Sequence, residues 1–166
     1  MKNFFYILLM LTMPVAAQTI QTNIEHSVPD NRYVVHNDGT VTDTATGLMW
    51  KQCSEGQIWN DGTCNGTATT HNFETAHALA SEANDGDYYD WRLPNVKELA
   101  SLVAENRNDP AINLTIFPDT FSSYFWSSSP YGNDGASSWI VDFYGGVDGN
   151  DSRTNANYVR LVRAGE

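Results

Sequence analysis

The stretch Asp90-Trp-Arg-Leu-Pro-Asn-Val-Lys-Glu-Leu99, near the middle of the 166-residue chain, carries the strongest local signals of the fold. Pro94 cannot continue an earlier helix, and Asn95 and Glu98 stand three residues apart, which is the spacing of a capping box with Asn as the cap. The pattern therefore predicts a helix that starts near Asn95 and ends at Asp109-Pro110. Its apolar stripe consists of Val96, Leu99, Leu102 and Val103.

The segments on either side predict a second helix and two groups of strands. Asn72 is a suitable cap for a helix over residues 73–83, which Asn84-Asp85-Gly86 ends. Runs rich in β-branched and aromatic residues predict strands at 32–36, 40–43, 48–51, 124–128, 139–143 and 158–163. Two polar loops, 130–138 and 145–157, separate the last three strands. Strands, two helices and further strands, in that order, are typical of an α+β domain.

The first 17 residues have the pattern of a secretory signal peptide. Lys2 supplies the only charge, a short apolar run follows, and Pro14 precedes small residues that end at Ala17. We expect cleavage after Ala17 and export to a periplasm or to the extracellular medium. The apolar run is too short to span a membrane. Cleavage leaves a flexible lead-in over residues 18–31 and a domain over residues 32–166.

The chain is acidic, with 9 Lys and Arg against 20 Asp and Glu and a formal net charge of −11. Removal of the segment that contains Lys2 makes the charge −12. Such a charge disfavours binding to nucleic acid or to anionic lipid. The 5 Trp, 8 Tyr and 7 Phe residues supply enough apolar surface for a folded core.

The two cysteines, Cys53 and Cys64, lie in a segment rich in turn-forming residues. Because an exported chain meets an oxidising compartment, an even pair predicts a disulfide. A catalytic dithiol normally has the closer Cys-x-x-Cys spacing, and a zinc site needs four ligands. The pattern therefore favours a structural staple.

The sequence contains no recognisable catalytic constellation. The four histidines, at positions 26, 36, 71 and 77, do not have the spacing of zinc ligands. No Gly-x-Ser-x-Gly nucleophile motif and no glycine-rich phosphate loop occur. We therefore expect a non-enzymatic protein that requires no cofactor.

Clusters of side-chain oxygens leave one cofactor open, namely Ca²⁺. Asp85, Asp87 and Asp90 form one such cluster, and Asp148, Asn150 and Asp151 form another. Ca²⁺ takes six to eight oxygen ligands, so either cluster suits it chemically. Asn, Asp and Gly also form turns without any metal, and the sequence does not choose between the two interpretations.

Aromatic residues border the two polar loops of the C-terminal third. An aromatic face beside Asn and Asp side chains suits a sugar ring, because the ring stacks while its hydroxyl groups take hydrogen bonds. Core packing is the competing role for Trp139. The candidate ligand-binding residues are Tyr131, Asn133, Asp134, Trp139, Tyr144, Asp148, Asn150, Asp151 and Arg153.

Several motifs, taken in order, resemble the Lcl C-terminal domain family, a domain of unknown function named for the end of a collagen-like adhesin. The resemblance covers about residues 32–163. Its motifs are Gly39-Thr-Val-Thr-Asp-Thr-Ala-Thr-Gly-Leu-Met-Trp50, Asp90–Leu99, Phe125-Trp-Ser-Ser-Ser129, Trp139-Ile-Val-Asp-Phe-Tyr-Gly145 and Tyr158-Val-Arg-Leu-Val-Arg163.

The resemblance implies a C-type-lectin-like fold, distantly related to the domain of formylglycine-generating enzymes. Such a fold has two helices on small twisted antiparallel sheets, with its N- and C-terminal strands, here 32–36 and 158–163, paired. Trp91-Arg-Leu-Pro94 is then a structural signature, and ligands bind on the loop face. Cys53 and Cys64 precede both helices, unlike the reactive cysteines of the formylglycine enzymes, so that activity is not carried over.

These observations predict an exported, non-catalytic binding module that recognises a glycan or another cell-surface ligand. Two alternatives stay open. One is a carboxylate-dependent hydrolase of cell-envelope sugars, which needs two carboxyl groups in a cleft. The other is a structural subunit whose exposed strand edge docks a partner protein. The sequence does not indicate an oligomeric state.

Overall fold

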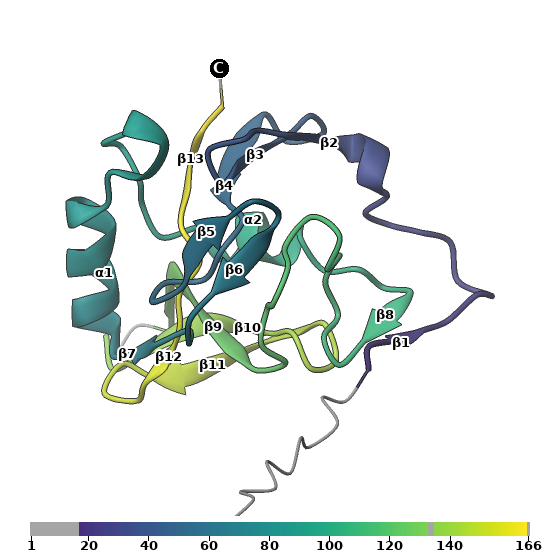
Figure 1. Cartoon of the computed structure of the whole chain (residues 1–166). Helices are drawn as coiled ribbons and strands as arrows, with labels where there is room; N and C mark the ends of the chain where they lie inside the picture. Colours follow the sequence, from purple (N-terminus) through teal and green to yellow (C-terminus); the bar gives the residue numbers. More distant parts are fainter. Residues whose placement is uncertain (1–16, 133–134, 166) are drawn as a thin grey trace, which may run out of the picture.

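The computed structural model describes residues 17–132 and 135–165, which form an α+β domain (Figure 1). Two α-helices and four small sheets make up this part of the chain. The predicted α+β class is thereby confirmed. No helix within the described ranges is long and apolar enough to cross a membrane.

A four-stranded antiparallel sheet brings together segments near the two ends of the domain. Its order is β13-β4-β3-β2. The strands are β2 (Tyr33–Val35), β3 (Thr40–Asp43), β4 (Leu48–Lys51) and β13 (Val162–Ala164). The predicted pairing of the first and last strands is wrong, because β13 pairs with β4 while β2 occupies the opposite edge. Two hairpin strands thus separate the terminal ones.

A five-stranded sheet has the order β11-β10-β9-β12-β7. Its strands are β7 (Thr70–His71), β9 (Tyr124–Tyr131), β10 (Ser137–Asp142), β11 (Val147–Ser152) and β12 (Asn157–Tyr158). The prediction of a loop over residues 145–157 is therefore largely wrong, because β11 occupies much of that range. Strands β9 and β10 also extend into the loop predicted at 130–138. The polar sequence of β11 has little strand propensity, but its backbone pairs with β10 along six residues.

The two helices begin where the sequence predicts. Helix α1 (Phe73–Glu82) is capped by the Asn72 side chain, which accepts a hydrogen bond from Thr75 N at 2.9 Å. Helix α2 (Val96–Ala100) has the predicted capping box between Asn95 and Glu98. It is much shorter than expected, because the chain turns at Ser101 and the amide of Ala104 bonds the carbonyl of Ala111 instead. Leu102 still reaches the core without belonging to a long helix.

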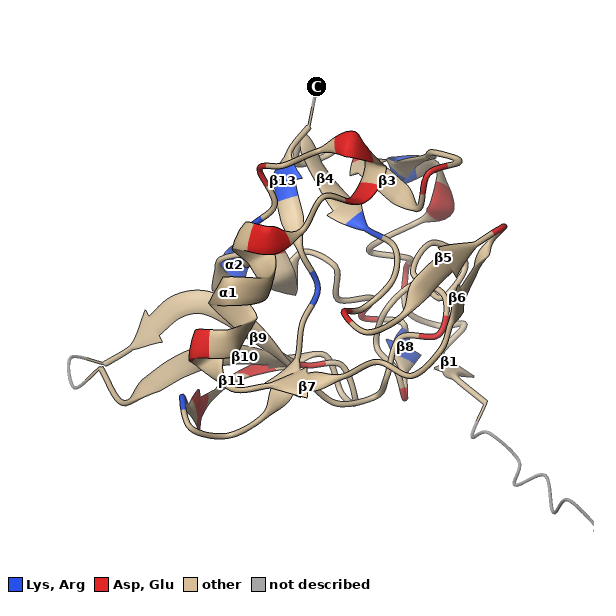
Figure 2. Cartoon of the chain, turned by 60° about the vertical axis from the view of Figure 1, so that its left-hand side comes forward, with Lys and Arg blue, Asp and Glu red and all other residues tan. Residues whose placement is uncertain are grey.

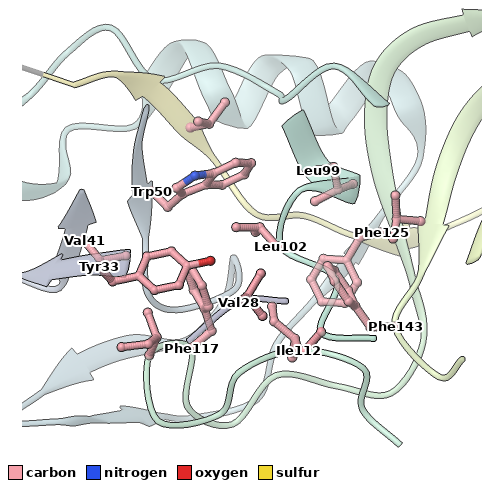
Figure 3. Packing of buried hydrophobic residues seen from close by; sticks show 14 residues of the cluster. Val28, Tyr33, Val41, Trp50, Leu99, Leu102, Ile112, Phe117, Phe125 and Phe143 are labelled. Carbon is pink, nitrogen blue, oxygen red and sulfur yellow. The ribbon is translucent and has the colours of Figure 1, made fainter. Parts of the chain in front are cut away.

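The five-stranded sheet lies between two apolar clusters. Phe125 and Val141 belong to a cluster with Trp50, Leu99 and other residues, which Figure 3 shows from close by. Their chain neighbours Trp126 and Ile140 belong to a second cluster, which contains Trp91. Successive residues of a strand point to opposite faces, so each face of the sheet is covered.

The remaining elements are short and lie around these sheets. The 3₁₀ turns are η1 (Asp30–Arg32) and η2 (Asp85–Asp87), and a small hairpin is formed by β5 (Ile58–Asn60) and β6 (Thr63–Asn65). Strand β1 (Thr19–Ile20) pairs with β8 (Arg107–Asn108), on the side of the domain opposite α1 in Figure 1.

The lead-in over residues 18–31 contacts the rest of the domain at several points. The Gln18 side chain bonds the carbonyls of Pro110 and Ile112, and Val28 is buried in the core. Backbone pairing and one buried valine hold the segment in place. Neither kind of contact produces an apolar periodicity in the sequence. A sequence pattern cannot reveal contacts of that kind.

Candidate functional site

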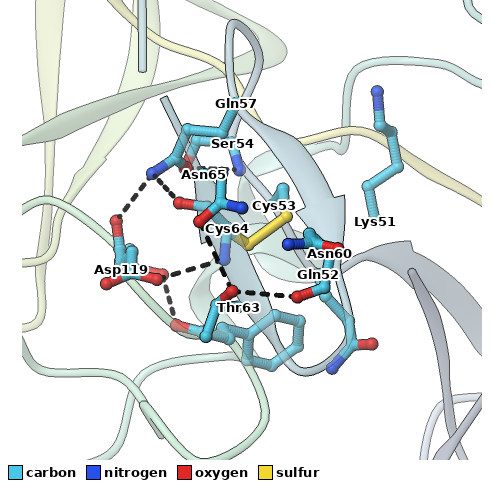
Figure 4. Close-up of a disulfide and its surroundings, with 12 residues drawn as sticks. Lys51, Gln52, Cys53, Ser54, Gln57, Asn60, Thr63, Cys64, Asn65 and Asp119 are labelled. Carbon is cyan, nitrogen blue, oxygen red and sulfur yellow. Dashed lines mark hydrogen bonds between the residues drawn. A yellow bond between two sulfur atoms is a disulfide. The ribbon is translucent and has the colours of Figure 1, made fainter. Parts of the chain in front are cut away.

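A disulfide joins Cys53 and Cys64, as the sequence predicts, with an S–S distance of 2.08 Å. It joins the middle of β6 to the segment between β4 and β5 (Figure 4). The amide of Cys64 donates to a carboxylate oxygen of Asp119 at 3.1 Å, and the Gln57 side chain donates to the Asp119 carbonyl at 3.3 Å. These hydrogen bonds hold the stapled hairpin against the segment that contains Asp119.

The stapled segment is also held by a fully buried arginine, Arg160. Its guanidinium donates to the carbonyls of Lys51 and Gln52 and, at 2.7 Å, to the Thr120 hydroxyl. Burial lowers the pKa of Arg160 to about 9. This cation is consequently part of the core and offers no charge to an external ligand.

Two of the predicted ligand-binding residues meet on the surface of the β9–β10–β11 hairpins. The rings of Tyr131 and Trp139 are 4.9 Å apart in an edge-to-face arrangement. Tyr131 is 39% exposed, and Trp139 is half-buried. Asn150 lies directly opposite Trp139 in the β10–β11 ladder and is exposed, so both side chains point to the same face. These three residues are the part of the predicted site that the structure assembles.

The structure places two other predicted residues, Asp151 and Arg153, away from this pair. Asp151 lies opposite Ser138, one position from Trp139, and therefore points to the other face. Its carboxylate accepts hydrogen bonds from two asparagine side chains, one in the following turn and one in β12. The Arg153 Nε donates to the Ser138 hydroxyl at 2.9 Å, and its guanidinium lies over the Phe73 ring at 4.5 Å. Both side chains fasten the hairpin to its surroundings.

The remaining predicted residues are spread along the same strands. Asp148 is exposed and lies opposite Val141, and Tyr144 is 56% exposed in the turn after β10. Asn133 and Asp134 lie outside the described residues. The predicted site is thus an extended strand surface and not one closed pocket.

Two of the carboxylates predicted as calcium ligands form ion pairs with basic side chains. Asp85 lies 2.7 Å from the Lys51 ammonium, and Asp90 lies 2.6 Å from the Arg163 guanidinium. Asp87 has a left-handed backbone, with φ of 61°, as expected of a turn residue. No group of three or more His, Cys, Asp or Glu side chains in the described ranges is arranged to hold a metal ion.

A cavity of about 520 Å³ lies beside the disulfide, at a place that sequence reasoning missed. Its wall combines carboxylates, amides, hydroxyls and one exposed aromatic ring. The walls come from segments far apart in the chain, so no local motif announces the cavity. The lining residues that carry its chemistry are Gln18, Gln57, Asp109, Asp119, Phe121 and Ser122.

The described chain is therefore a compact α+β domain with one disulfide, an aromatic pair at the surface of its hairpins and a separate cavity beside the disulfide. Among known families, the Lcl C-terminal domain matches residues 39–163, and the chain belongs to this family. The match agrees with the resemblance seen in the sequence motifs. A search of curated proteins finds no match to the chain.

Proposed function

We propose that the protein is an exported, non-catalytic binding module that recognises a neutral glycan on the surface of the β9–β10–β11 hairpins. The observation that carries the proposal is the contact between the Tyr131 and Trp139 rings on an exposed strand surface. Aromatic rings in this setting stack on the C–H face of a sugar. Asn150, directly across from Trp139, supplies both a donor and an acceptor for sugar hydroxyls.

The charge distribution favours a neutral ligand over an anionic one. The basic side chains are largely committed within the domain: Arg32 pairs with Asp43, Lys51 with Glu55 and Asp85, Arg92 with Glu98, and Arg163 with Asp90. Arg160 is buried. Asp and Glu residues are distributed over many elements in Figure 2. A polyanion would meet a repulsive field at such a surface.

Export is part of this proposal and rests on the signal-peptide pattern of residues 1–17. The disulfide supports it, because such bonds persist in oxidising compartments. A C-type-lectin-like arrangement of the domain is also part of the proposal. Its support is the family resemblance together with two helices and small sheets whose strand pairs are antiparallel except for the parallel pair β9–β12.

The test is a binding experiment with the purified, disulfide-bonded protein. An array of neutral and sulfated oligosaccharides identifies probes, and calorimetry then measures their affinity in the presence of Ca²⁺ and of a chelator. We expect binding to neutral oligosaccharides that weakens about tenfold in Trp139→Ala, the usual loss when a central aromatic contact is removed.

The matched control is Tyr144→Ala, which removes another exposed aromatic ring from the same sheet region. It should leave the affinity unchanged while Trp139→Ala reduces it. Equal losses in both variants, or an unchanged affinity in Trp139→Ala, would place the ligand elsewhere on the molecule. Failure of every neutral oligosaccharide to bind the folded protein would reject glycan recognition itself.

A further inference from the structure

The side chain of Gln18, at the edge of the described chain, makes an unusual set of hydrogen bonds. Its Nε2 donates to the carbonyl of Pro110 at 2.5 Å and to that of Ile112 at 2.7 Å. Its Oε1 accepts from the Arg107 guanidinium at 3.3 Å. Both amide hydrogens and the amide oxygen are thus engaged by a segment about ninety residues further along the chain.

The backbone next to Gln18 reinforces this attachment. Thr19 and Ile20 pair with Asn108 and Arg107, and the amide of Gln21 bonds the carbonyl of Asn106 at 2.8 Å. The exposed side chains of residues 19–21 contribute little burial. The Gln18 amide is therefore the main side-chain contact that fastens the start of the segment to the domain.

The position of Gln18 gives this arrangement a chemical consequence. Cleavage after Ala17 makes Gln18 the amino-terminal residue. An amino-terminal glutamine cyclises to pyroglutamate when its α-amino nitrogen attacks the side-chain Cδ. The N–Cδ bond forms, the Cδ–Nε2 bond breaks, and ammonia leaves with the proton that the amine gives up. No other reactant is needed.

We propose that the folded domain protects its own amino-terminal Gln18 from cyclisation by holding the side-chain amide. The reaction requires the side chain to leave Pro110 and Ile112 and to fold back over its own backbone. It also removes Nε2, so the product loses both hydrogen bonds to those carbonyls. The mature chain thereby keeps a free α-amino group on Gln18, a residue that lines the 520 Å³ cavity.

This inference rests on the proposed export and cleavage, and its test separates the two. The protein is expressed with residues 1–17, purified after export, and its intact mass is measured. We expect a chain that begins at Gln18 and has not lost ammonia. A chain that begins at another residue would overturn the inference together with the predicted cleavage. A chain that begins at Gln18 but is already cyclised would overturn the inference alone.

A rate comparison supplies the second measurement. The purified protein and a synthetic peptide of residues 18–22 are incubated side by side, and the loss of ammonia is followed by mass spectrometry. Two hydrogen bonds of ordinary strength should slow the reaction in the folded protein on the order of thirtyfold. Equal rates in the protein and the peptide would show that the amide is not held in solution.

A pair of variants tests the attachment without the cyclisation. Gln18→Glu replaces the donor by a carboxylate that cannot bond two carbonyl oxygens, and it should increase hydrogen exchange across residues 19–24. The matched control is Gln21→Glu, which makes the same change at an exposed side chain. An equal response in both variants would mean that the Gln18 side chain does not fasten the segment.

Discussion

Removing the disulfide should lower the free energy of unfolding by an amount that the structure allows us to state. Cys53 and Cys64 are 11 residues apart, and both are buried. The chain-entropy model gives about 3 kcal/mol for a loop of this length. For a domain of this size, that loss corresponds to a decrease in Tm of roughly 6 to 12 °C.

The perturbation is best made in two ways, since each has a different side effect. Reduction of the wild-type protein breaks the bond and keeps the sulfur atoms, whereas a Cys53→Ala, Cys64→Ala double variant also leaves space in a buried site. Thermal and urea unfolding are measured for both forms beside the oxidised protein. Both should be destabilised, with the double variant at least as unstable as the reduced wild type.

Two outcomes would contradict this reasoning. A loss below about 1 kcal/mol in the reduced protein would mean that the hydrogen bonds to Asp119 and the surrounding packing already fix the loop without the staple. An equal Tm for the oxidised and the reduced protein would also contradict the structural role of the disulfide. A single Cys53→Ala variant should behave like the double variant, because either change removes the cross-link.

Two further predictions concern buried charge and pH. Asp43→Asn should destabilise the protein by about 3 kcal/mol in urea unfolding, because the fully buried carboxylate is paired with Arg32. Burial by itself raises the pKa of Asp43, but the hydrogen bonds from Arg32 and Thr46 outweigh it and hold the pKa below its ordinary 3.8. This stabilisation is complete above about pH 4 and is lost as the pH falls through the lower pKa of the folded state. The free energy of unfolding of Asp43→Asn should therefore decrease less at acid pH than that of the wild type. An equal decrease in both proteins would contradict the role given to the Asp43 carboxylate. Burial, together with the charge of Arg153, lowers the pKa of His77 below 6.5, so stability should be highest above that pH and fall as the pH drops towards the folded value. His77→Gln should remove this slope in thermal unfolding between pH 7 and 5, whereas the exposed-site change His26→Gln should retain it.

Local signals in the sequence predicted the starts of the helices and the disulfide. The capping box at Asn95 and Glu98 and the cap at Asn72 act within one turn, so the residues that decide the structure are neighbours in the chain. The end of α2 was not predictable in the same way. It depends on the backbone hydrogen bond from the amide of Ala104 to the carbonyl of Ala111. The apolar residues of this segment still have the spacing of a helix.

Strand pairing shows the limit of sequence patterns most clearly. β11 has the sequence Val-Asp-Gly-Asn-Asp-Ser, which favours a turn, yet it is an edge strand because β10 offers it a complete ladder. The separation of Asp151 from Asn150 follows from the same register, since neighbouring residues of a strand face opposite sides. The predicted ligand-binding residues of these strands therefore belong to two groups, which lie on opposite faces of the sheet.

The exposed aromatic pair is presented by a hairpin that is fastened on both faces. On one face, Arg153 donates a hydrogen bond to the Ser138 hydroxyl, and its guanidinium lies over the Phe73 ring. Two residues before Tyr131 on β9, the Ser129 hydroxyl accepts a hydrogen bond from the amide of Val96, at the start of α2. Because these contacts exist without any ligand, binding at Tyr131 and Trp139 does not have to order the strands that carry them.

That rigidity separates the proposed site from a flexible recognition loop. A ligand that stacks on a preformed surface loses little affinity to conformational ordering, and its specificity depends on the fixed position of the polar groups around the rings. Loosening the hairpin with Arg153→Ala should then weaken glycan binding although Arg153 lies on the opposite face from Trp139. The variant is compared with wild type for both glycan affinity and the contact between the two aromatic rings. A lower affinity with an unchanged ring contact would mean that Arg153 acts by holding the hairpin and not by contacting the sugar.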